Sequence, residues 1–371
     1  MFRLAHILII VMVAGWVLVA GCDSDRPPSS TLPADTDQNG ARSTAIADIR
    51  QTLDNLAGEG LYGVAYLTDR GSVVIHEALG WRSRKTRDPM QMTTGFDIGS
   101  ITKAMTAATV LKLEEQGQLR LSDAVSRFFP NAPEPLRNTT VAQLMDHTTG
   151  LPEYLGNDDE LVSKQQALNR LFDADFLFKP GTDEAYSNAG YTLLAIIIEE
   201  VSEQSFEQTL RESVLLPTVP QIGYRLADWE SSALAVGYVN GEDRGTPLDK
   251  PWLEDGPSWT LRGNGGLLST AEDVAQWFEA VFAGRILGAE ALSKFQARFA
   301  GSGPYGIRVG EAGGDDLTGF NAQHEAWPEV GISWTLITSR SIYPAEGIWE
   351  DVEDSVYQLV EIASRAELEH D

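Results

Sequence analysis

The chain has 371 residues, of which 43% are hydrophobic and 22% charged, and its formal net charge is -26. This composition is typical of a globular protein, and the length allows one large domain or two closely packed subdomains. Because so acidic a chain repels phosphate, we expect no nucleic-acid partner. Cys22 is the only cysteine, and none of the five histidines has metal-ligand spacing to another, so neither a disulfide nor a metal or organic cofactor is expected.

The first 22 residues predict a lipoprotein signal peptide. Arg3 precedes the apolar segment 4–20, and small residues then lead to Cys22. A basic start, an apolar stretch and small residues before a cleavage site are typical of a secretory signal. The sequence Val-Ala-Gly-Cys resembles a bacterial lipobox, whose cysteine is lipidated after cleavage. An ordinary signal peptide and an uncleaved anchor helix are the alternatives.

The lipobox predicts an exported protein that Cys22 anchors to the membrane, facing the periplasm or the cell exterior. Asp23 resembles an inner-membrane retention signal in hosts that sort lipoproteins in this way. Residues 23–44, rich in Asp, Ser, Pro and Thr up to about Gly40, predict a flexible tether. A single folded domain is expected over residues 45–371.

Strand patterns lie at both ends of this domain, with mostly helical patterns between them. Residues 61–68 and 73–75 predict strands around a turn, and alternating apolar residues at 332–336 predict another. Apolar residues at helical spacing over 348–363 predict a final amphipathic helix. We therefore expect an α/β (α+β) fold, with a sheet subdomain at about 45–115 and 270–368 and a helical subdomain at about 116–269.

Ser100 and Lys103 form the most informative motif. Ser100 lies at the predicted start of a helix that ends before Gly117, and Lys103 shares its helical face three residues later. A serine hydroxyl needs a base within hydrogen-bond reach to act as a nucleophile, and an amine with a lowered pKa can serve. On this motif alone, Ser100 as a helix cap with Lys103 as a solvated first-turn residue remains an alternative.

Tyr186 and Asn188 form a second motif just before a predicted buried helix that runs to Val201. Two residues apart in extended backbone, their side chains project to the same side. A phenol can pass a proton, and an amide can hold both a lysine and a substrate carbonyl. A core tyrosine followed by a capping asparagine is the alternative interpretation.

With these two motifs, the chain resembles the serine β-lactamase-like and penicillin-binding-protein superfamily, specifically its class C and esterase branch. The resemblance runs from about Leu61 to Ala363, in blocks that keep their order: Arg120–Val125, Phe128–Pro130, Leu144–Pro152, Pro180–Gly181, Tyr186–Tyr191 and Gly265–Asp273. It implies an antiparallel sheet flanked by helices and a mainly helical subdomain.

The resemblance also implies a role for each motif residue. Ser100 would be the nucleophile, Lys103 its activating partner, Tyr186 a proton shuttle, and Asn188 an anchor for the substrate and the lysine. The block around His147 is a structural turn in the family, so we interpret His147 as a packed, hydrogen-bonded histidine and not as a catalytic base.

The third motif of the family departs from its pattern here. The family places Lys or His, then any residue, then Gly, shortly before a Gly-Phe pair. The corresponding positions hold Gly313 and Asp315. In the family, two backbone N–H groups stabilise the oxyanion, and the second of them comes from this strand. By resemblance, the first donor here would be the N–H of Ser100 and the second the N–H of Asp316. Carboxylates near a developing oxyanion would oppose catalysis.

Two functions follow from these motifs. The first is a serine hydrolase that acts through an acyl-enzyme on a small-molecule or peptide ester or amide, as an esterase, D-peptidase or β-lactamase-like enzyme. A true β-lactamase is the less favoured of these, because the carboxylate-pairing lysine is missing. The second is a catalytically degraded protein of the cell envelope that binds or scaffolds. The sequence does not indicate an oligomeric state.

Overall fold

The computed structural model describes residues 34–371 except 158–159, 304–305, 316–317, 342–345 and 369–371. Its centre is a sheet of six strands in the order β11-β12-β13-β14-β1-β2, and every pair of neighbours is antiparallel. The strands span Ala300–Gly303 (β11), Gly306–Asp315 (β12), Phe320–Trp327 (β13), Ile332–Thr338 (β14), Gly63–Asp69 (β1) and Ser72–Leu79 (β2). The strands predicted at 61–68, 73–75 and 332–336 are confirmed.

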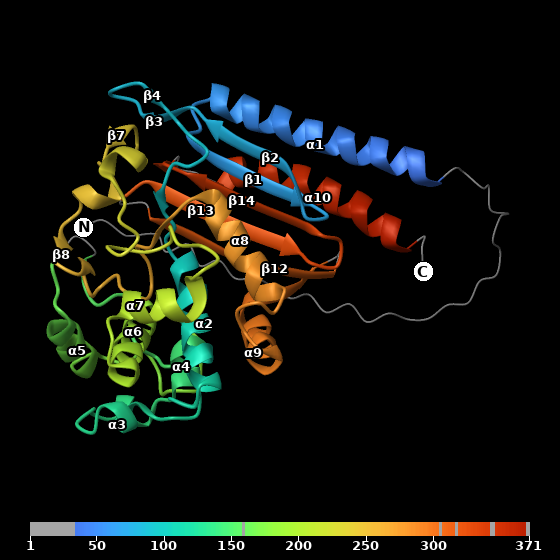
Figure 1. The fold of residues 1–371 in the computed structure, drawn as a ribbon. Helices are drawn as coiled ribbons and strands as arrows, with labels where there is room; N and C mark the ends of the chain where they lie inside the picture. The colour runs from blue at the N-terminus through green and yellow to red at the C-terminus, as the bar shows by residue number, and fades with distance from the viewer. Residues whose placement is uncertain (1–33, 158–159, 304–305, 316–317, 342–345, 369–371) are drawn as a thin grey trace, which may run out of the picture.

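The two faces of the sheet are both buried. Side chains of a strand alternate between faces, and in β1 Val64 and Tyr66 enter one apolar core while Ala65 and Leu67 enter the other. Helices α1 (Ala34–Gly58) and α10 (Glu346–Leu368) lie side by side over the outer face, as Figure 1 shows. The amphipathic helix predicted at the end of the domain is confirmed as α10.

Helix α1 begins within the segment that the sequence assigned to a tether. Residues 34–44 are helical, and the rest of that segment, with Cys22, lies outside the described residues. Arg42 is buried and pairs with the buried Asp69 of β1, and Ala45 and Ile49 enter the outer core. These contacts with the sheet explain why the helix extends beyond the apolar pattern visible in the sequence.

The inner face carries the helical part of the molecule. Helices α8 (Ala271–Phe282) and α2 (Ile101–Glu115) cover it, and α2 in turn contacts α6 (Asn188–Ser202) and α7 (Phe206–Leu210). The helices predicted after Ser100 and near Asn188 are therefore confirmed. The remaining helices are α3 (Val125–Phe128), α4 (Val141–Met145), α5 (Lys164–Phe172) and α9 (Ala289–Phe299).

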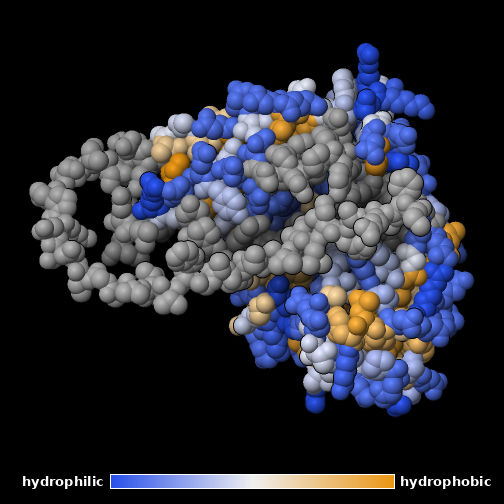
Figure 2. All heavy atoms as spheres, turned by 180° about the vertical axis from the view of Figure 1, so that it is seen from behind, coloured by the Kyte–Doolittle hydropathy of each residue, from blue (hydrophilic) through white to orange (hydrophobic). Residues whose placement is uncertain are grey.

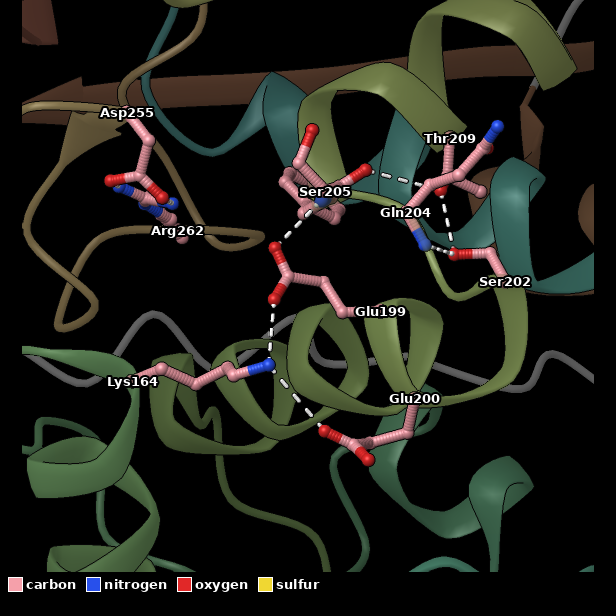
Figure 3. A network of polar contacts seen from close by, with 10 residues as sticks. Lys164, Glu199, Glu200, Ser202, Gln204, Ser205, Thr209, Asp255 and Arg262 are labelled. Atoms are coloured by element: carbon pink, nitrogen blue, oxygen red, sulfur yellow. Dashed lines mark hydrogen bonds and ion pairs between the residues drawn. The ribbon is translucent and has the colours of Figure 1, made fainter.

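A polar network ties the helical part together. Lys164 of α5 lies 3.0 Å from Glu199 and 3.4 Å from Glu200 of α6, and Glu199 also accepts the Phe206 backbone N–H of α7 at 2.8 Å (Figure 3). The face in Figure 2 is mostly hydrophilic, with hydrophobic residues gathered over its lower part. None of the described helices is long and apolar enough to span a membrane.

The remaining strands are short. They are β3 (Trp81–Ser83), β4 (Asp88–Pro89), β5 (Phe96–Asp97), β6 (Tyr238–Val239), β7 (Glu242–Asp243), β8 (Trp252–Leu253), β9 (Gly256–Pro257), β10 (Leu268–Ser269) and β15 (Arg340–Ser341). The pairing of β5 with β10 matters most for function, because β5 leads directly to Ser100 at the start of α2.

Candidate active site

Ser100 occupies the turn between β5 and α2. Gly99 takes a φ of +52°, which favours glycine, and its N–H donates to Asp97 Oδ1 at 2.8 Å. Ser100 then stands at the N-cap position of α2, but its side chain makes no capping hydrogen bond. Ser100 thus occupies the cap position that the alternative expected, but its hydroxyl does not cap the helix and is turned to other partners.

Lys103 lies one turn into α2 and is only 1% exposed. Its Nζ donates to Ser100 Oγ at 2.9 Å and to the Asn264 carbonyl oxygen at 2.7 Å. The alternative of a solvated lysine is wrong. Next to Asn264, Gly263 has a φ of +81° and packs closely on α6, where a Cβ at this position would lie 2.6 Å from the Tyr191 main-chain carbonyl oxygen.

Tyr186 completes the contacts of the serine hydroxyl. Its Oη lies 2.7 Å from Ser100 Oγ, although the two residues are 86 positions apart in the chain. The Lys103 ammonium lies 4.8 Å from the centre of the Tyr186 ring, within the range of a cation–π interaction. The structure thus brings Ser100, Lys103 and Tyr186 around one oxygen atom.

Asn188 lines the same cleft at the start of α6. Its backbone N–H donates to the Glu153 carbonyl at 2.9 Å. Its Oδ1 is buried and has no hydrogen-bond partner among the described residues. Asn264, through its carbonyl, makes the contact with Lys103 that the resemblance assigned to Asn188.

His147 packs behind the tyrosine. Its Nδ1 accepts the Ser187 N–H at 3.1 Å, and its ring centre lies 4.8 Å from that of Tyr186 and 5.2 Å from that of Tyr191. Burial, and next the charge of Lys103, lower the pKa of His147 to about 4. The imidazole is therefore neutral at neutral pH, in agreement with its interpretation as a packed histidine.

A cleft of about 980 Å³ opens above the serine hydroxyl. Its lining combines aromatic, proline, amide and charged residues, among them Glu153, Tyr154, Asn157, Asn188, Pro247, Lys250, Trp252, Asn264, Thr318 and Asn321. The amide and charged groups suit a polar substrate, and the aromatic groups supply apolar contact. Among the described residues, no cluster of three or more His, Cys, Asp or Glu is placed to hold a metal.

One wall of the cleft is the β8–β9 hairpin, which Arg262 fixes in place. The buried Arg262 pairs with Asp255 at 2.8 and 2.5 Å and donates through Nε to the Pro257 carbonyl at 2.8 Å. The guanidinium of Arg225 lies 4.8 Å from the ring of Trp252. These contacts hold the wall against the body of the protein.

The segment that corresponds to the family's third motif lies at the end of β12 (Gly306–Asp315). In the register with β13, Gly313 is opposite Ala322, and Gly314 is opposite Asn321. Asn321 lines the cleft, so this strand end does border it. Asp316, the expected second oxyanion donor, lies outside the described residues.

Sequence reasoning missed several residues of the site. Asn264 offers a main-chain carbonyl, which any residue type carries, so no motif could reveal it. The carbonyls of Pro152 and Glu153 likewise hold the Ser187 hydroxyl and the Asn188 N–H. Pro152 ends the His147 block, and that block's place in the resemblance was the only signal for this contact.

Comparison with known proteins identifies the family of the chain. The family model described as Beta-lactamase matches residues 49–339. Penicillin-binding protein 4* of Bacillus subtilis (strain 168) is 28% identical over 254 residues, which cover 62% of this chain and 55% of that protein. Protein flp of Staphylococcus aureus (strain NCTC 8325 / PS 47) is 30% identical over 226 residues, 57% of this chain and 44% of that protein. The chain thus spans about half the length of these relatives.

Solved structures show the same fold. A penicillin binding protein from Bacillus halodurans superposes with a TM-score of 0.66 at 23% identity, covering 86% of this chain and 99% of that one. The D-amino acid amidase from Ochrobactrum anthropi SV3, in complex with D-phenylalanine, gives a TM-score of 0.69 at 22% identity, covering 89% and 99%.

Proposed function

Because this chain belongs to the Beta-lactamase family and is similar to penicillin-binding protein 4*, we propose that it is a serine hydrolase that forms an acyl-enzyme at Ser100. One observation carries the proposal. The Ser100 hydroxyl, at the edge of a cleft, lies within hydrogen-bond distance of both an amine and a phenol. The substrate is an ester or an amide.

The reaction follows from these contacts. Ser100 Oγ bonds to the substrate carbonyl carbon, while its proton leaves through Lys103 and Tyr186. The same proton then reaches the alcohol or amine that departs when the ester or amide bond breaks. The Ser100 N–H, at the start of α2, is placed to donate to the oxyanion. Water finally cleaves the acyl-enzyme, releasing the acid and restoring the serine.

Labelling with a fluorophosphonate probe tests the proposal. The native protein should be labelled at a single serine, and Ser100→Ala should abolish the labelling, because the attacking oxygen is gone. Ser269→Ala provides a matched control that keeps Ser100. Thermal unfolding of each variant checks that the fold is retained.

The opposite result would favour the degraded-site alternative. If the native protein shows neither Ser100-dependent labelling nor hydrolysis across a broad panel of esters and amides, the chain is a binding or scaffolding protein. The observation behind this alternative is the third motif, which places Gly313 where the family has a cation. The strand then lacks the positive charge that the family carries at this position.

We further propose that the enzyme acts at the cell envelope as a lipoprotein. The support is Arg3, the apolar segment 4–20 and Cys22, all outside the described residues. Cells that express the full chain and are fed radiolabelled palmitate should yield a labelled protein. Cys22→Ser should remove the label, and a label that persists in this variant would contradict lipidation.

A further inference from the structure

His147 makes two contacts that bracket Tyr186. Its carbonyl oxygen accepts the Ala185 N–H at 3.0 Å, and its Nδ1 accepts the Ser187 N–H at 3.1 Å. A single residue therefore fixes the backbone on both sides of the phenol. Its ring also packs against the Tyr186 ring, with 4.8 Å between ring centres.

The conformation of His147 suits this task. Its φ of +56° lies in the left-handed region, which only a few per cent of residues other than glycine adopt, with Asn, Asp and His the most frequent among them. Such a conformation persists only where surrounding contacts hold it, and it tends to occur at functional sites. Here the hydrogen bonds of His147 are made with the segment that carries Tyr186 and Asn188.

We propose that His147 is a positioning residue, whose Nδ1 and carbonyl oxygen hold Tyr186 at hydrogen-bond distance from Ser100. This rests on the proposed hydrolase function, in which Tyr186 carries the proton. His147 is not among the residues that line the cleft, so it acts through Tyr186. Its neutral imidazole keeps Nδ1 an acceptor at neutral pH, and the groups that face it are Lys103 of α2 and Tyr186 and Tyr191 around α6.

Two substitutions separate the acceptor from the ring. His147→Asn places an amide oxygen where Nδ1 lies and tolerates a positive φ, but it removes the ring. His147→Phe keeps a ring and loses the acceptor. We expect the Asn variant to keep the fluorophosphonate labelling rate within about fivefold of the native protein, and the Phe variant to lose at least about thirtyfold. The loss should fall on the maximal rate of labelling and leave the probe's half-saturating concentration unchanged.

A second measurement does not depend on activity. Amide hydrogen exchange, followed by mass spectrometry on a peptide spanning 184–190, should rise in His147→Phe and stay near native in His147→Asn. A peptide within α2 serves as the internal reference. Tyr186→Phe should lose labelling and keep the exchange protection, because its backbone contacts remain. If His147→Phe does not fold, His147→Ala replaces it.

Each outcome is decisive. Native exchange in the variant without the acceptor, or native labelling in that variant, overturns the proposal. A larger defect in the Asn variant than in the Phe variant also overturns it, since the ring would then matter and not the acceptor. If the native protein is not labelled at all, the hydrolase function fails, and the exchange data alone still decide whether His147 positions Tyr186.

Discussion

Lys103→Met is expected to lower the rate of Ser100 labelling by about a thousandfold, within the range of general acid–base contributions. The amine is buried and donates directly to the serine hydroxyl, so its removal deprives the nucleophile of its base. The fold should persist, because methionine is similar in length to lysine and its flexible apolar side chain suits a buried site. The measurement is the second-order rate constant with a fluorophosphonate, together with urea unfolding.

Lys112→Met supplies the matched control. It lies on the same helix but contacts Glu115 and the Ile286 carbonyl, far from the cleft lining. We expect near-native labelling from this variant. Native-rate labelling of Lys103→Met would contradict the assigned role of the amine. Tyr186 would then be the remaining candidate for the base.

Acid should destabilise the protein through His324, in the core between the sheet and α8. The ring is fully buried, stacks on Phe278 with 4.3 Å between ring centres, and contacts the Thr335 hydroxyl through Nδ1 at 2.8 Å. Burial lowers its pKa from 6.5 to about 3. Between these values the unfolded chain binds a proton that the folded protein does not. The free energy of unfolding therefore falls as the pH is lowered from about 6.5 toward 3, and this contribution is constant above 6.5.

The size of this effect can be measured against a non-titrating variant. A pKa shift of this order changes the free energy of unfolding by roughly 3–5 kcal/mol between neutral pH and the acid limit. His324→Phe should keep the stack on Phe278, unfold at a similar urea concentration at pH 7, and lose stability less steeply in acid. Thr338→Val, a buried substitution on the same strand that leaves His324 and its hydroxyl partner in place, should keep the native pH dependence. Equal acid sensitivity of the Phe variant and the native protein would contradict the prediction.

Much of the fold is predictable because its signals are local. Alternation in residues 332–336 and helical periodicity after Ser100 reflect which side chains must be buried, and both elements appear where expected. Helix α1 shows the limit. Its residues 34–44 lack an apolar pattern, and the ion pair of Arg42 with Asp69, which no local pattern reveals, joins it to the sheet.

The residues of the candidate site also fall into those that local sequence patterns predict and those that they do not. Ser100 and Lys103 lie three residues apart, so their shared face follows from helix geometry, whereas their meeting with Tyr186 came only through the family resemblance. The Asn264 carbonyl could not be predicted, because every residue has one. His147 was assigned its packing role, but its two contacts around Tyr186 depend on a φ that the sequence does not specify.

The carbonyl groups of Pro152, Glu153 and Asn264 hold three members of the site, and this has an evolutionary consequence. Substitution at such positions changes the side chain and spares the main-chain acceptor. The codons there can drift as long as the path of the chain is kept. Distant relatives could then share this arrangement while differing in amino-acid sequence at these positions. Superposition of backbones would in that case reveal a relationship that sequence alignment no longer detects.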